Sequence, residues 1–249
     1  AYLAETSFLL ETVEEIKLAI NNLLNFNIDL GHNIITVTEV DEEDWATAWK
    51  KYYHPVKISN RFTIVPTWEE YNRVNSDELI IELDPGMAFG TGTHPTTVMC
   101  LQALEKTVKP NLSVVDVGTG SGVLSIGAAK LGAVTVHALD LDEVAVRSAQ
   151  ENIAINRVSD IVKVTHGNLL DNITEQADIV VANILAEIIM TFTDDAYTIV
   201  KSGGQFITSG IISTKKDDVK AALQNSGFEI DEIMMMEDWV TIISRKPVK

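Results

Sequence analysis

The sequence predicts an α/β fold: a doubly wound parallel sheet that ends in an antiparallel hairpin and follows a small α+β segment. Three observations support this prediction. A glycine-rich turn over residues 118–122 joins a buried apolar strand to an apolar helix. Strands and helices then alternate as far as residue 225, as they do in parallel sheets. Only Glu237 and Asp238 separate the last two strands, and so short a link allows only antiparallel pairing.

The first forty residues predict part of a small α+β domain. Residues 13–24 have the apolar spacing of an amphipathic helix, and residues 34–40 alternate as a strand does. These few elements bury little surface by themselves. We therefore expect the domain over residues 1–40 to be partial, so that it either packs on the remainder of the chain or continues upstream.

Residues 41–83 predict a linker helix and connector strands. The acids at 41–44 favour the start of a helix over residues 45–53, because acidic side chains stabilise a helix N-terminus. Trp45 and Trp49 share one face of that helix, and we interpret them as packing residues. Two strands are expected to follow, at residues 62–65 and 79–83.

Residues 84–249 predict the main domain. Its strands are expected at residues 114–117, 134–140, 161–165, 177–182, 205–209, 228–236 and 239–244. Its helices are expected at residues 95–106, 123–131, 143–156, 186–200 and 215–225. The third helix is expected to bury Val144, Ala145, Ala149 and Ile153. Pro95 starts the first helix after Thr93 or His94, so we interpret His94 as a capping or core residue rather than a catalytic base.

Residues 114–122 carry the strongest chemical signal. Their glycines are spaced G-x-G-x-G, whereas folds that seat a pyrophosphate space them G-x-G-x-x-G. An acid just before these glycines suits a cofactor with a cationic end and no phosphate, and an acid at the end of the next strand can accept both hydroxyls of a ribose. The motif therefore predicts S-adenosylmethionine, and the alternative is a turn that serves only strand-to-helix geometry. The residues expected to contact it here are Asp116, Gly118, Thr119, Gly120, Asp140 and Leu141.

Asn183 is the candidate catalytic residue. It follows the fourth strand, and in open α/β sheets the reacting groups meet the cofactor at the carboxyl ends of the strands. Its carboxamide oxygen could hold an amine hydrogen and aim the nitrogen lone pair at the methyl group, although it could also cap the following helix. The cofactor already carries a good leaving group, so the protein's tasks are positioning and desolvation. Asn168 and Leu169 follow the third strand and are expected beside the adenine.

The composition limits the class of partner. The net charge is −17, which disfavours direct contact with nucleic acid and favours a cationic partner such as a basic protein. Charge that serves solubility alone is the open alternative. There is no apolar run long enough to span a membrane and no signal-peptide pattern, and the lone Cys100 excludes an intramolecular disulfide. We expect a cytoplasmic monomer without a metal.

Several motifs together resemble the bacterial ribosomal protein L-eleven methyltransferase (PrmA) family. They are Phe89-Gly90-Thr91-Gly92-Thr93-His94-Pro95-Thr96-Thr97, Asp116-Val117-Gly118-Thr119-Gly120-Ser121-Gly122, Asn183-Ile184-Leu185-Ala186, Gly210-Ile211 and Glu237-Asp238-Trp239. The resemblance covers roughly residues 41–249 and implies a class I methyltransferase, Rossmann-like sheet. It places Thr97, with Thr96 beside it, Gly118, Asp140 and Asn183 at the cofactor.

The resemblance also implies a reaction. Members transfer methyl groups from S-adenosyl-L-methionine to the α-amino group and lysine ε-amino groups of one large-subunit ribosomal protein, and they release S-adenosyl-L-homocysteine. A ferredoxin-like N-terminal domain recognises that substrate, and only about half of such a unit precedes residue 41 here. A methyltransferase of another protein or small-molecule amine is the alternative. An NAD-linked oxidoreductase and a non-catalytic binding module fit the motifs less well.

Overall fold

The computed structural model describes residues 9–26, 28, 30–31, 53–84, 92–171 and 173–248, and the chain forms two compact units, Ala1–Tyr52 and Tyr53–Lys249. In the first unit, helix α1 (Leu9–Asn22) runs into a 3-10 turn, η1 (Leu23–Phe26). The predicted helix over 13–24 is confirmed, with an earlier start. The predicted strand over 34–40 lies outside the described residues, as does nearly all of the predicted helix over 45–53.

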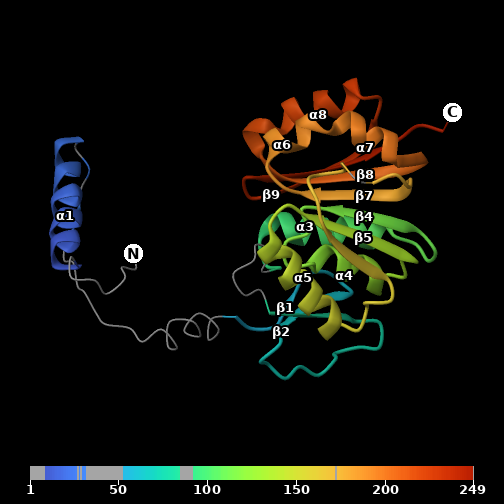
Figure 1. The fold of residues 1–249 in the computed structure, drawn as a ribbon, viewed down its shortest axis with the longest axis horizontal. Coiled ribbons are helices and arrows are strands. Elements are labelled where there is room, and N and C mark those ends of the chain that lie inside the picture. The colour runs from blue at the N-terminus through green and yellow to red at the C-terminus, as the bar shows by residue number, and fades with distance from the viewer. Residues whose placement is uncertain are drawn as a thin grey trace. The chain divides into compact units, whose positions relative to one another are not determined.

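The second unit is built on a seven-stranded sheet with the order β6-β5-β4-β7-β8-β10-β9 (Figure 1). The strands are β4 (Ser113–Val117), β5 (Thr135–Asp140), β6 (Val162–His166), β7 (Ala177–Asn183), β8 (Val200–Ile212), β9 (Glu229–Met236) and β10 (Trp239–Arg245). The strands from β6 to β8 are parallel, and β10 pairs antiparallel with both β8 and β9. The predicted closing hairpin is therefore confirmed.

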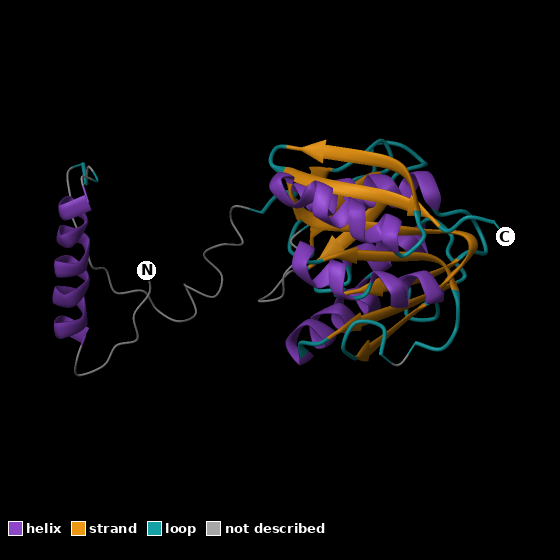
Figure 2. Cartoon of the chain, turned by 90° about the horizontal axis from the view of Figure 1, so that it is seen from above, coloured by secondary structure: helices purple, strands orange, loops and turns teal. Residues whose placement is uncertain are grey.

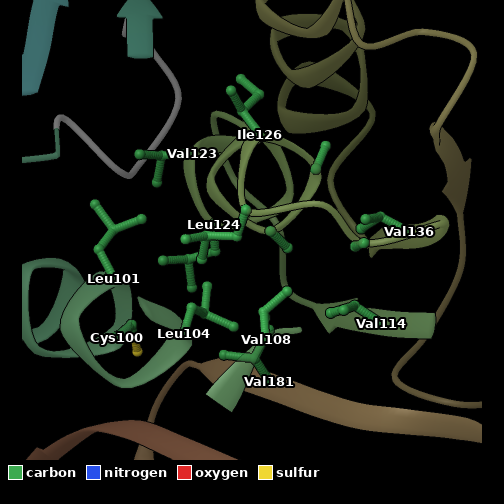
Figure 3. Close-up of a cluster of buried hydrophobic side chains, with 14 of the residues drawn as sticks. Cys100, Leu101, Leu104, Val108, Val114, Val123, Leu124, Ile126, Val136 and Val181 are labelled. Carbon is green, nitrogen blue, oxygen red and sulfur yellow. The ribbon is translucent and has the colours of Figure 1, made fainter. Parts of the chain in front are cut away.

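Helices cover both faces of this sheet (Figures 1 and 2). One face carries α3 (Pro95–Thr107), α4 (Val123–Lys130) and α5 (Glu143–Ile155), and the other carries α6 (Ala186–Thr191), α7 (Thr193–Ile199) and α8 (Lys216–Asn225). Side chains alternate between these layers along each strand, so Val114 belongs to the first core cluster and Val115 to the second. Figure 3 shows part of the first core, in which Leu101 and Leu104 of α3 lie near Leu124 of α4.

A smaller sheet adds to the first core. It has the order β1-β2-β3, with β1 (Val56–Lys57), β2 (Phe62–Pro66) and β3 (Leu79–Leu83). The buried side chains of Phe62, Ile64 and Ile81 belong to the same cluster as the inner face of α4. The two strands predicted in this region are confirmed. Their burial joins residues 53–84 to the main sheet in one compact unit.

Three details of the predicted elements were wrong. Val144 is 36% exposed on α5 rather than buried. The single helix predicted over 186–200 is two helices, because Phe192 breaks the helical backbone (φ −127°) and packs edge-on against Phe206 in the second core. The strand predicted at 205–209 is the longer β8, which passes through Gly203. None of the helices in the described part of the chain is long and apolar enough to cross a membrane.

Candidate functional site

The glycine turn after β4 is fixed by backbone hydrogen bonds to the end of β5. Gly118, Gly120 and Gly122 have φ angles of 72°, 56° and 84°, in the left-handed region that favours glycine. The N–H groups of Gly118 and Thr119 each donate to the Leu139 carbonyl oxygen at 2.9 Å. The turn therefore follows the position of β5 closely.

Asp116 supports this turn from inside the protein. The residue is 0% exposed, and its Oδ2 accepts hydrogen bonds from the hydroxyls of Thr119 (2.7 Å) and Ser125 (2.6 Å). Its Oδ1 is buried without a hydrogen-bond partner among the described residues. Burial raises the pKa of Asp116 to about 6, against the lowering effect of the two hydroxyls. The side chains of Asp116 and Thr119 thus support the turn from inside the protein. The predicted contact of these two residues with the cofactor stays a prediction.

Asp140 stands at the end of β5 and links three parts of the site. Its Oδ2 accepts from the Gly120 N–H at 2.9 Å, and its Oδ1 accepts from the Asp142 N–H at 3.0 Å. Asp142 in turn caps α5 through the Val144 N–H at 2.8 Å. A carboxylate offers about four lone-pair sites, so Asp140 retains acceptor capacity after these two bonds. Leu141, the next residue, is exposed.

The turn after β6 lies beside Asp140. The Gly167 N–H donates to the Asp140 carbonyl oxygen at 2.9 Å, and His166 Nε2 donates to the Leu141 carbonyl oxygen at 2.9 Å. In this turn Leu169 has a φ of 49° and packs against the second core. Asn168 is exposed, and its amide donates to Asp171 within the same turn at 3.1 Å.

Asn183 meets the N-terminus of α3 at the end of β7. Its Nδ2 donates to the buried Thr97 Oγ1 at 3.4 Å. The adjacent strand β8 reaches the same helix, because Ser209 Oγ donates to the Thr96 carbonyl oxygen at 3.3 Å. The fold thus brings Thr96, Thr97 and Asn183 together, although they are far apart in the sequence. Ser209 was not predicted, and its hydroxyl carries no sequence signal that would have identified it.

His94 is the N-cap of α3, as the sequence predicted. Its Nδ1 accepts from the Thr96 N–H at 3.3 Å and lies 2.8 Å from the Thr96 hydroxyl. His94 thus has the capping role that the sequence predicted for it. The ring packs edge-on against Trp239 at 4.8 Å between centroids. Sequence reasoning missed this contact, since the two residues have no local relationship.

The predicted site residues therefore lie together at the carboxyl ends of the parallel strands β4, β5, β6 and β7. Open α/β sheets bind their ligands at these strand ends. A carboxylate, a glycine turn and a carboxamide are present there, and no cluster of His, Cys, Asp or Glu in the described ranges could hold a metal ion. The donor set suits an uncharged ribose and an amine better than a phosphate.

Comparison with known proteins then determines the family. Residues 2–247 match the sequence profile described as Ribosomal protein L11 methyltransferase (PrmA). The protein named "Ribosomal protein L11 methyltransferase" from Anoxybacillus flavithermus is 69% identical over 246 residues, which are 99% of this chain and 79% of that protein. The chain belongs to the ribosomal protein L11 methyltransferase (PrmA) family. The protein of the same name from Bacillus subtilis is 65% identical over 246 residues, again 99% of this chain and 79% of its own length.

A solved member of the PrmA family shares the fold. The crystal structure of ribosomal protein L11 methylase from Lactobacillus delbrueckii subsp. bulgaricus superposes with a TM-score of 0.74 at 40% identity, over 78% of this chain and 100% of that one. The family resemblance, the class I methyltransferase fold and the enzyme class predicted from the motifs are confirmed. An oxidoreductase and a non-catalytic binding module are disfavoured.

Proposed function

We propose that this chain transfers methyl groups from S-adenosyl-L-methionine to ribosomal protein L11, at its α-amino group and at lysine ε-amino groups, up to the trimethylated state. One observation carries the chemistry. The bond between Gly120 and Asp140 and the contact between Asn183 and Thr97 both lie at the carboxyl ends of the parallel strands, which supports a nucleoside site beside a carboxamide that could hold the amine. Membership of the PrmA family supports the choice of substrate.

The residues at these strand ends fit the cofactor. Asp140 retains acceptor capacity for ribose hydroxyls, and Gly118 and Gly120 present a turn without side chains. Leu141, Asn168 and Leu169 are proposed to flank the adenine, and Thr96 and Thr97 to line the methionine end. When bound, the cofactor supplies a sulfonium-activated methyl group and its leaving group. The protein does not need strong acid–base chemistry of its own.

Asn183 is the proposed catalytic residue. Its amide nitrogen donates to Thr97, so its Oδ1 is directed away from that hydroxyl and can accept a hydrogen bond from a substrate amine. A contact of this kind fixes the direction of the nitrogen lone pair. Holding two reactants in a productive geometry is the main contribution that a methyl transfer requires from the protein.

The charge of the chain suits the proposed substrate. A net charge of −17 attracts a basic ribosomal protein over long range and repels free nucleic acid. The domain division stays a proposal: residues 1–40 contribute to substrate recognition, 41–83 connect, and 84–249 carry the cofactor site. We further propose that the enzyme acts in the cytoplasm as a monomer.

The decisive experiment is transfer of labelled methyl from S-adenosyl-L-methionine to purified large-subunit ribosomal proteins. We expect label on one basic protein, L11, and no label with the variant Asp140→Ala. If the chain binds the cofactor but transfers no methyl group to L11, the proposed cofactor site stands and the proposed substrate is wrong. Failure to bind S-adenosyl-L-homocysteine by calorimetry would overturn the proposed reaction as a whole.

A further inference from the structure

A pair of exposed apolar side chains lies immediately after Asn183. Leu185 is 67% exposed and Ile188 is 42% exposed. The Ile188 N–H donates to the Leu185 carbonyl oxygen at 3.0 Å, so the pair spans the first turn of α6. Side chains three residues apart lie on the same side of a helix. The two residues therefore form one apolar surface at the edge of the candidate site, which we call the α6 anchor.

The backbone that carries the α6 anchor is held from two sides. A Cβ on Gly118 would lie 2.4 Å from the Ile184 side chain, and a Cβ on Gly210 would lie 2.3 Å from the Ile184 carbonyl oxygen. Ile184 is thus packed tightly between the glycine turn and the end of β8. Because Ile184 is held, Leu185 projects outward from a rigid support. A backbone segment that is held in place before binding loses less conformational entropy on contact with a partner.

Acidic side chains lie on α6 itself, on α8, which packs against α6, and in the turn between β9 and β10. Lys215 pairs with Glu187 of α6 at 3.8 Å and with Asp218 of α8 at 3.5 Å. The turn between β9 and β10 joins the same region, since the Ser213 N–H donates to the Asp238 carbonyl oxygen at 2.8 Å. We call the charged residues of these segments the acidic rim. Its acids are Glu187, Asp217, Asp218, Glu237 and Asp238, and its cations are Lys215 and Lys216. The rim therefore has an excess of negative charge.

We propose that the α6 anchor binds the polypeptide of the protein substrate next to the accepting amine, through an apolar residue of a basic segment. This inference rests on the proposed function and adds to it the surface that selects the segment. The acidic rim attracts basic residues that flank the apolar one. A second copy of this chain fits the α6 anchor less well, because the acidic rims of the two copies would repel each other.

The test compares steady-state kinetics with L11 for Leu185→Ser, the double variant Leu185→Ser/Ile188→Ser and a matched control. The control is Val134→Ser, which replaces an apolar side chain of similar exposure, 53%. Val134 lies just before β5, at the amino end of that strand and therefore at the end opposite to the candidate site. We expect Leu185→Ser to raise KM about tenfold, which corresponds to about 1.4 kcal/mol, and the double variant to raise it further. The kcat and the affinity for S-adenosyl-L-homocysteine should stay unchanged, as should every parameter of Val134→Ser.

A second arm tests the acidic rim. Glu187→Lys should raise KM and reduce the rise of KM with ionic strength, because the attraction is electrostatic. If KM is unchanged in Leu185→Ser and in Leu185→Ser/Ile188→Ser while the wild type transfers methyl groups normally, the α6 anchor is overturned and the proposed function stands. Absence of transfer by the wild type overturns the proposed function and the anchor with it. A fall in kcat alone would also contradict the proposal.

Discussion

The backbone N–H of Gly120 donates a 2.9 Å hydrogen bond to the carboxylate of Asp140. The glycine turn after one strand is thus tied directly to the acid that ends its neighbour. The same carboxylate orients the start of α5 through the Asp142 N–H. Asp140 is therefore both a proposed ligand of the cofactor and a support for the loops that surround it.

Replacement of Asp140 tests this double role. Asp140→Ala removes the ribose acceptor and leaves the Gly120 and Asp142 N–H groups without their partner. We expect the affinity for S-adenosyl-L-homocysteine to fall at least tenfold, and the free energy of unfolding to fall by about 1–3 kcal/mol. Calorimetric titration and urea denaturation measure the two effects. Unchanged affinity would show that Asp140 does not bind the cofactor.

Asn183→Ala should separate catalysis from binding. The variant removes the carboxamide that is proposed to orient the amine, and it leaves Thr97 without the 3.4 Å contact. Misplacement of a reacting group costs on the order of a hundredfold in rate, so we expect kcat to fall by about that factor. The affinity for S-adenosyl-L-homocysteine should change by less than about tenfold. Single-turnover methyl transfer measures the rate, and a kcat equal to that of the wild type would assign Asn183 a structural role.

Gly210→Ala tests the packing that fixes the loop after Asn183. The added Cβ would lie 2.3 Å from the carbonyl oxygen of Ile184, so the backbone of one of the two segments would have to shift. Gly132→Ala is the matched control, because its φ is also positive (104°) while the nearest atom to its Cβ is 3.5 Å away. Both variants carry backbone strain of about 1–3 kcal/mol, and only Gly210→Ala adds a clash of about 1–3 kcal/mol. Urea denaturation should show the larger loss for Gly210→Ala, and equal losses would contradict the proposed packing.

The buried acid Asp116 predicts a pH dependence of stability. Burial raises its pKa to about 6 in the folded protein, whereas an aspartate in an unfolded chain titrates near about 3.9. Between these values the folded state binds the proton more tightly than the unfolded state does. The free energy of unfolding should therefore decrease as the pH rises from about 4 to about 6, by an amount on the order of 3 kcal/mol.

Asp116→Asn is the control for this effect, since an amide does not titrate. The difference in unfolding free energy between the wild type and Asp116→Asn should change across the same pH interval and be constant above it. Urea denaturation at a series of pH values measures the difference. Parallel profiles for the two proteins would show that Asp116 has an ordinary pKa in the folded state.

Much of the fold could be predicted from the sequence, because its signals are local. The glycines at 118–122, the apolar strands and Pro95 each restrict their own backbone, and the structure places the corresponding elements within a few residues. The helix break at Phe192 could not be predicted in this way. There Phe192 packs against Phe206 of strand β8, which is distant in the local sequence pattern and fills the same core. Val144 was likewise assigned to the core by helical spacing, although the neighbouring layer does not cover it.

The sequence by itself determined the family, the order of the elements and the identity of the groups at the strand ends, such as Asp140 and Asn183. Only the tertiary structure decided what those groups contact. It turned Asp116 inward to support the turn, joined Asn183 to Thr97 and left Leu185 exposed on a fixed backbone. The physical reason is that the local sequence determines where a strand ends and which residue stands there. The groups that this residue contacts belong to other strands and helices, which only the tertiary structure brings close.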